Sequence, residues 1–60
     1  MTFRLLLIED DRTLRTGLRD ALAGDGYEVV AAADGHEGRA LLRSDRYDLL
    51  VLDVMLPGPS

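Results

Sequence analysis

The sequence contains no cysteine and no lysine, and each absence excludes a class of chemistry. Without cysteine the chain can form neither a disulfide framework nor a thiolate metal site. All seven basic residues are arginine, so a reaction that needs a lysine ammonium must take that group from outside these 60 residues. The lack of cysteine also suits a reducing compartment.

Long apolar runs and an excess of positive charge are missing as well. No segment approaches the roughly 18 uninterrupted apolar residues of a membrane span. The first residues lack the basic region, long apolar stretch and small-residue cleavage site of a signal peptide. The net charge of −4 opposes direct nucleic-acid binding, because affinity there comes largely from neutralising phosphates. We therefore expect a cytoplasmic chain that contacts neither membrane nor nucleic acid through these residues.

The apolar residues follow two kinds of pattern along the chain, short continuous runs and helical spacing. Residues 3–8, 27–33 and 47–54 are short, largely apolar runs typical of strands, and the first and third are apolar on both faces. Leu14, Leu18, Ala21 and Leu22 recur at helical spacing between the first two runs. A second helix is predicted through "EGRALLRSD", with Ala40 and Leu41 as its core contacts. The sequence therefore predicts one small α/β unit with the order β-α-β-α-β.

Strands joined by helical crossovers are parallel. If the two most apolar strands are neighbours, the strand order is 2-1-3. The chain then proceeds across the sheet in one direction from the first strand to the second and in the other direction to the third. Ligands of open α/β sheets bind at the carboxyl ends of the strands, beside such a reversal.

Acidic residues follow both of these apolar strands. "LLLIEDD" ends on Glu9, Asp10 and Asp11, and "DLLVLDV" contains Asp53. Repulsion between carboxylates brought this close favours a bound cation or raised pKa values. Mg²⁺ prefers carboxylate and carbonyl oxygens, water and a substrate phosphate. A carboxylate here is also able to act as a nucleophile toward phosphorus, so Glu9, Asp10 and Asp53 are the candidate site.

The other polar residues have simpler interpretations. Asp11 is expected to cap the first helix, and Asp34 with Glu37 forms a predicted capping box for the second. His36 stands in a helical turn without a nearby partner and is expected at the surface. The remaining expected surface or cap residues are Asp25, Asp45, Asp48 and the arginines, which are interpreted as solvated.

The quoted segments, together with "GYEVVAAADGHEGRALL" and "YDLLVLDVMLPG", resemble the receiver domain of two-component response regulators. The resemblance covers essentially all 60 residues and is greatest to receivers that precede a DNA-binding domain. It implies a flavodoxin-like doubly wound sheet. It also implies a phosphoryl group taken from a sensor histidine kinase, a donor that the residues alone do not supply.

Specific roles follow from this resemblance. Asp53 matches the phospho-accepting aspartate, and Asp10 matches the acid that binds Mg²⁺ directly together with Asp53. Glu9 matches the acid that reaches the metal through water, and the backbone carbonyl of Met55 matches the third protein ligand. The turn that shapes the following loop is matched by Pro57 and Gly58.

Receivers of this family continue beyond the match. Two further strands and three further helices follow, and they carry a Ser or Thr and a lysine that respond to the phosphoryl group. Residues 1–60 are therefore expected to be the first half of a receiver, not competent to switch alone. The third strand would leave an edge and apolar faces uncovered, which favours self-association.

One other function fits the same residues, and a second does not. The chain is alternatively a non-catalytic structural fragment that folds by self-association. An aspartate-dependent phosphatase or dehalogenase typically has a second acid two residues after the nucleophile, but position 55 is Met. We therefore expect a phospho-acceptor module, not an enzyme with its own turnover beyond Mg²⁺-dependent self-phosphorylation.

Overall fold

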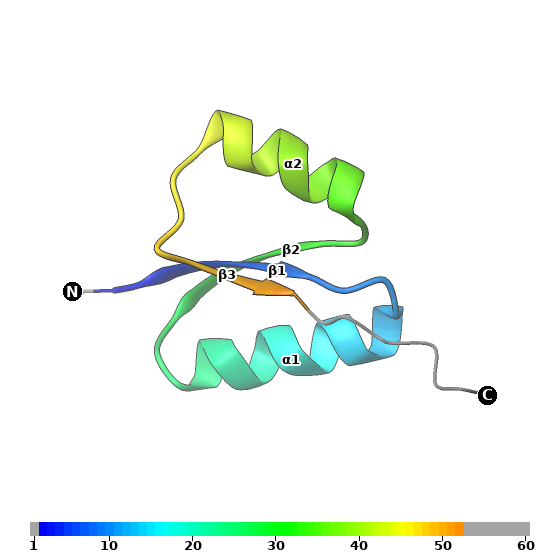
Figure 1. Cartoon of the computed structure of the whole chain (residues 1–60). Coiled ribbons are helices and arrows are strands. Elements are labelled where there is room, and N and C mark those ends of the chain that lie inside the picture. The colour runs from blue at the N-terminus through cyan, green and yellow to red at the C-terminus, as the bar shows by residue number, and fades with distance from the viewer. Residues whose placement is uncertain (1, 53–60) are drawn as a thin grey trace.

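The computed structural model describes residues 2–52 (Figure 1). The elements along the chain are β1 (Arg4–Ile8), α1 (Arg12–Gly24), β2 (Glu28–Ala32), α2 (Gly35–Ser44) and β3 (Leu49–Leu52). This order confirms the predicted β-α-β-α-β arrangement, with ends shifted by a few residues. Gly26 lies between α1 and β2 with a φ of 99°, a conformation that glycine adopts at little cost.

Aspartates begin both helices, as predicted. The carboxylate of Asp11 accepts a hydrogen bond from the Leu14 amide at 3.0 Å, and that of Asp34 accepts one from the Glu37 amide at 2.8 Å. The capping box of α2 differs from its predicted form. In a capping box the Glu37 carboxylate would accept from the amide of the cap residue Asp34. It accepts instead from the amide of the preceding residue, Ala33, at 2.6 Å, and so holds the backbone just before the helix.

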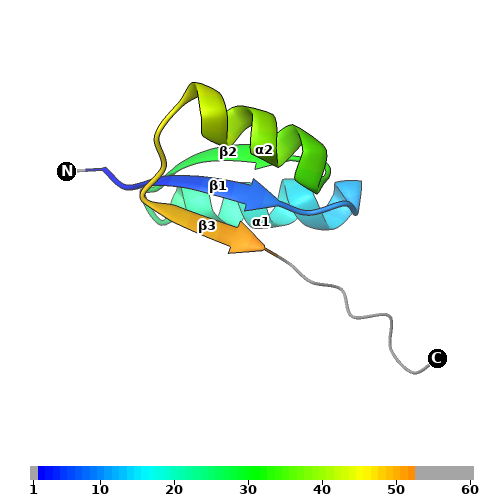
Figure 2. The same cartoon turned by 45° about the horizontal axis from the view of Figure 1, so that its top comes forward.

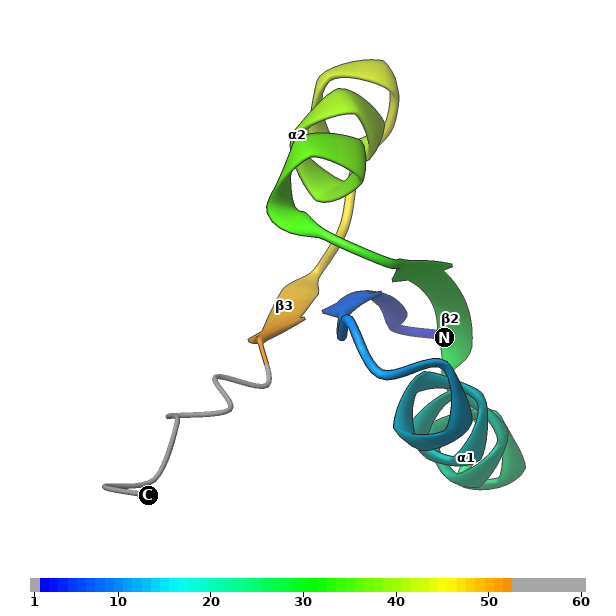
Figure 3. The same cartoon turned by 90° about the vertical axis from the view of Figure 1, so that its right-hand side faces the viewer.

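The three strands form a parallel sheet in the order β2-β1-β3, which confirms the predicted topology (Figure 2). The helices lie on opposite faces of this sheet (Figure 1). The backbones of both helices lie close to β1 and β2, and within residues 2–52 neither helix backbone comes as close to β3 (Figure 3). The central strand β1 is therefore the best covered part of the fold.

The core is small and centres on β1. Leu5, Leu6, Leu7 and Ala32 are its buried apolar residues. The predicted contribution of the helices was partly wrong, because α1 has no fully buried residue and Ala40 is exposed. Gly38 is the buried residue of α2 instead. With no side chain, it allows the helix to approach the sheet closely over Ile8.

The third strand is exposed, as predicted from its uncovered position beside β1. Leu49, Leu50 and Leu52 have exposed fractions of 58%, 42% and 56%. A parallel strand with this composition normally lies covered on both faces. An open hollow of about 250 Å³ lies beside it, lined by Phe3, Leu5, Tyr27, Asp48 and Leu49. Across residues 2–52, neither helix is long and apolar enough to span a bilayer.

Candidate acidic site at the ends of the strands

Glu9 follows β1 directly and is held at three points. Its amide donates to the Ala32 carbonyl at 3.1 Å, which extends the pairing of β1 with β2 by one residue. Its carboxylate Oε2 accepts from the Asp11 amide at 2.8 Å, and its carbonyl accepts from Arg15 Nη1 at 2.9 Å. Only 1% of Glu9 is exposed, so this acid belongs to the framework of the site.

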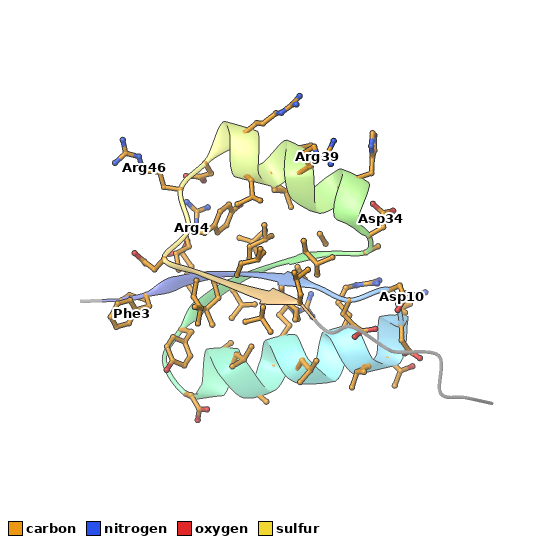
Figure 4. All side chains as sticks on the ribbon, in the orientation of Figure 1. Phe3, Arg4, Asp10, Asp34, Arg39 and Arg46 are labelled. Carbon is orange, nitrogen blue, oxygen red and sulfur yellow. The ribbon has the colours of Figure 1, made fainter. Side chains whose placement is uncertain are left out.

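Asp10 lies at the surface immediately after Glu9. Figure 4 shows its side chain at the end of the sheet where α1 begins, the same end at which Asp34 starts α2. Asp10 is exposed, in contrast to Glu9. The acid pair therefore divides into a buried member that supports the loop and an exposed member that can reach a ligand.

The register of the sheet brings the ends of β1 and β3 together. Ile8 pairs with Leu52, the last residue that the structure describes. Strands β1 and β3 are thus neighbours that finish at the same edge (Figure 2). The other predicted site residues, Asp53, Met55, Pro57 and Gly58, lie outside the described residues.

The geometry around Glu9 fits a hard cation nearby. Its Oε1 atom is buried and has no hydrogen-bond partner among residues 2–52. A buried carboxylate oxygen without a partner is costly, and an ion or an ordered water normally satisfies it. Carboxylate oxygens are the donors that Mg²⁺ selects. Within residues 2–52 alone, no three potential metal-ligating side chains gather, so these residues do not complete a metal site.

Arg15 contacts the acidic loop after β1, which the sequence did not predict, because every arginine was interpreted as solvated. Its guanidinium is half-buried and bound to the Glu9 carbonyl. The available signal was its position one turn after the cap Asp11, from which a long side chain can reach back over the acidic loop.

Arg4 is the second arginine that has defined partners, although it was also predicted to be solvated. It lies at the opposite end of the strands from the acidic loop. Its guanidinium forms ion pairs with Asp45 and, at 2.9 Å, with Glu28. The Glu28 contact is electrostatic, because the Arg4 Nε–H is not directed well enough to make a hydrogen bond. The guanidinium carbon also lies 5.1 Å from the centre of the Tyr47 ring, within cation–π range. Arg4 therefore ties β2 and the segment before β3 to the central strand.

This cluster shifts two pKa values. The hydrogen bond with Asp45 raises the pKa of Arg4. The Arg46 amide, and then Arg4, lower the pKa of the Asp45 carboxyl. Asp45 and Asp48, expected only as caps or surface residues, thus have defined partners. Asp48 exchanges two hydrogen bonds with the backbone of Arg4, each of 2.7 Å.

Comparison with known families identifies this arrangement. The sequence model of the family called response regulator receiver domain matches residues 5–60. The chain belongs to the response regulator receiver domain family. The predicted resemblance and the predicted fold are both confirmed.

His36 is exposed in the first turn of α2, as expected of a surface residue outside the acidic site.

Individual relatives of the receiver domain extend beyond the matched segment. The transcriptional regulatory protein AfsQ1 of Streptomyces coelicolor is 57% identical over 54 residues, which cover 90% of this chain and 24% of that protein. The response regulator MprA of Mycolicibacterium vanbaalenii is 49% identical over 57 residues, covering 95% and 25%. The chain thus spans about a quarter of the length of these relatives.

A solved structure shows the same fold. The chemotaxis response regulator CheY4 of Vibrio cholerae superposes with a TM-score of 0.86 at 33% sequence identity. The superposition covers 97% of this chain and 48% of that one. The described sheet and helices therefore correspond to about half of that receiver.

Proposed function

We propose that this chain is the phospho-acceptor part of a response regulator, with Asp53 as the residue that takes the phosphoryl group. The pairing of Ile8 with Leu52 carries the proposal, because Glu9 and Asp53 directly follow these two paired residues in the sequence. Neighbouring parallel strands deliver the residues after their carboxyl ends to one edge of the sheet.

The proposed metal ligands are the Asp10 carboxylate, the Asp53 carboxylate and the Met55 carbonyl. Glu9 contributes through water from its unpaired Oε1. These residues would hold Mg²⁺, which would supply positive charge to neutralise the phosphoryl oxygens. The exposure of Asp10 and the burial of Glu9 support this division between a direct and an indirect ligand.

The proposed reaction is a displacement at phosphorus. A carboxylate oxygen of Asp53 attacks the phosphorus of a phosphohistidine on a sensor kinase, and an acyl phosphate P–O bond forms as the P–N bond breaks. The imidazole leaves with the electron pair and takes up a proton. The chain contributes an acceptor and orienting groups, and it is consumed in the step, so it is not an enzyme with its own turnover.

The partners follow from the same proposal. A sensor histidine kinase supplies the phosphoryl group in the cytoplasm. AfsQ1 is named as a transcriptional regulatory protein, and we propose the same output here through a DNA-binding domain after residue 60. Residues 1–60 form the first half of the receiver and do not contact DNA themselves, in keeping with their charge of −4.

Phosphorylation by a small donor tests this function. The chain is incubated with Mg²⁺ and acetyl phosphate, and its intact mass is recorded beside that of Asp53→Asn. The expected result is one phosphoryl adduct that needs Mg²⁺ and is lost in the variant. An unlabelled chain, under conditions that label a complete receiver, would overturn phospho-acceptance by these residues alone.

The exposure of β3 favours a second candidate, a non-catalytic fragment that folds by self-association. Three leucines of this four-residue strand are exposed, and its outer edge has no partner strand among the described residues. Apolar edges of this kind pair with other chains. We infer a homodimer or larger assembly that covers β3. A compact, monodisperse monomer in light scattering contradicts the assembly.

A further inference from the structure

Asp10 lies between two peptide groups that are both hydrogen-bonded to other residues. The carbonyl before it, that of Glu9, accepts from Arg15 Nη1 at 2.9 Å. The amide after it, that of Asp11, donates to Glu9 Oε2 at 2.8 Å. Both contacts are partly buried, whereas Asp10 itself is exposed.

These two hydrogen bonds determine where the Asp10 side chain starts. The Glu9 carbonyl belongs to the planar peptide unit that precedes the Asp10 Cα, and the Asp11 amide belongs to the unit that follows it. Because each unit is planar, holding both planes leaves φ and ψ of Asp10 little freedom. The direction of the Cα–Cβ bond is then fixed, although Asp10 is at the surface.

Both anchors are themselves held by the fold. The Arg15 amide donates to the Asp11 carbonyl at 2.8 Å in the first turns of α1, so its side chain returns from a regular helix. Glu9 is tied to β2 through the Ala32 carbonyl. Arg15 therefore links the start of α1 to the end of β1, and the acidic loop lies between them.

We propose that Arg15 is a positioning residue for the cation site, acting by orienting the peptide group before Asp10. This inference rests on the proposed function, in which Asp10 binds Mg²⁺. A preorganised ligand binds its metal more tightly because less conformational entropy is lost on binding. Outer groups that orient metal ligands typically contribute about 10–100-fold to metal affinity.

Charge alone predicts the opposite effect. Arg15 adds a positive charge beside the carboxylates of Glu9, Asp10 and Asp11, and a nearby positive charge repels Mg²⁺. Removal of the guanidinium would then strengthen cation binding. Positioning predicts weaker binding after the same change, so the sign of the change in Kd separates the two roles.

The first test measures backbone order without metal. Amide relaxation by NMR is recorded for the isotope-labelled chain and for Arg15→Met, Arg15→Lys and Arg12→Met. We expect the order parameters of the Asp10 and Asp11 amides to fall in Arg15→Met, with partial recovery in Arg15→Lys. Arg12→Met is the matched control, since it removes an exposed arginine three residues away on the same helix. Unchanged order in Arg15→Met overturns the inference.

The second test measures Mg²⁺ affinity by isothermal titration calorimetry. The Kd of Arg15→Met is expected to rise by about tenfold or more, while Arg12→Met binds equally well or more tightly. Equal or tighter binding by Arg15→Met contradicts positioning. If Arg15→Met does not fold, Arg15→Lys decides by the same criterion, with a smaller expected rise in Kd.

The two tests separate this inference from the function on which it rests. A wild-type chain that does not bind Mg²⁺ contradicts the proposed metal site. The order of the Asp10 amide still decides in that case whether Arg15 positions the loop, because that measurement uses no metal.

Discussion

Ile8 fills the space directly under Gly38. A Cβ atom at Gly38 would lie 2.9 Å from Ile8 Cγ1 and nearer still to Cδ1, whereas a Cβ at Gly17 would meet nothing within 4 Å. Both glycines lie inside helices. Their substitution by alanine therefore brings the same gain in helix propensity, but only the substitution at Gly38 creates a steric clash.

We expect Gly17→Ala to raise the free energy of unfolding by about 1 kcal/mol, the usual difference in helix propensity between the two residues. Gly38→Ala is expected to lower it by about 1 kcal/mol, because overpacking typically costs about 1–3 kcal/mol and exceeds the propensity gain. Urea denaturation followed by circular dichroism measures both.

A double-mutant cycle identifies the cause. Ile8→Val removes Cδ1, the nearest atom, and should recover part of the loss in the Gly38→Ala background but not in the Gly17→Ala background. Equal effects in the two backgrounds would show that the contact with Ile8 is not responsible.

The hydrogen bond from the Arg46 amide, and then the ion pair with Arg4, predict acid sensitivity through the carboxyl of Asp45. The pKa of Asp45 is lowered in the folded chain from an ordinary value of 3.8. Its contribution to stability is therefore complete above that value and is lost as pH falls through the lower folded pKa. Unfolding free energies measured from about pH 5 to about pH 2 should fall less steeply in Asp45→Asn than in the wild type.

Asp20→Asn is the matched control for this titration. Asp20 is also an exposed carboxylate near an arginine, Arg19 at 3.6 Å, but it lies on α1 away from Arg4. We expect its pH profile to follow that of the wild type. If Asp45→Asn and Asp20→Asn give the same slope, the contacts of Asp45 do not cause the acid sensitivity.

The cap of α2 should be separable from the cation site. Asp34→Ala removes the hydrogen bond to the Glu37 amide and is expected to cost about 1 kcal/mol of stability. Asp34→Asn retains a capping oxygen and should cost much less. Mg²⁺ affinity should be unchanged in Asp34→Asn. A tenfold loss of affinity in that variant would place Asp34 in the cation site.

Self-association should depend on the exposed face of β3. Leu49→Lys puts a charge on the strand and beside the hollow, and we expect it to shift the assembly toward monomer in sedimentation or light scattering. Leu42→Lys is the control, because Leu42 is similarly exposed but lies on α2. Equal dissociation by the two variants would mean that β3 is not the interface.

The sequence predicted the elements better than it predicted their contacts. Apolar runs, helical spacing and the caps Asp11 and Asp34 are local signals, and each led to the observed element. The strand order followed from which runs were apolar on both faces. Periodicity did not show that Gly38, and not Ala40, meets the sheet, because this depends on how closely α2 approaches Ile8.

The contacts of two arginines show the same limit. Arg4 meets Asp45 and Asp48 across more than forty positions of sequence, and no local pattern reports such a pairing. Arg15 lies close in sequence to the acid that it contacts, but the contact is with the carbonyl of Glu9, which any residue would offer. The role of Glu9 and Asp10 in a cation site stays a prediction, which rests on the position of the two acids directly after an apolar strand.

The most direct test of the account is a Mg²⁺ titration of the isotope-labelled chain followed by amide NMR. The central claim is that the acids after β1 and the acid after β3 bind one cation. We predict that the amides of Asp10 and Asp53 shift together with a single Kd, and that Asp53→Asn weakens the response at Asp10. Shifts confined to one strand end, or a response at Asp10 that is unchanged in Asp53→Asn, would contradict a shared site.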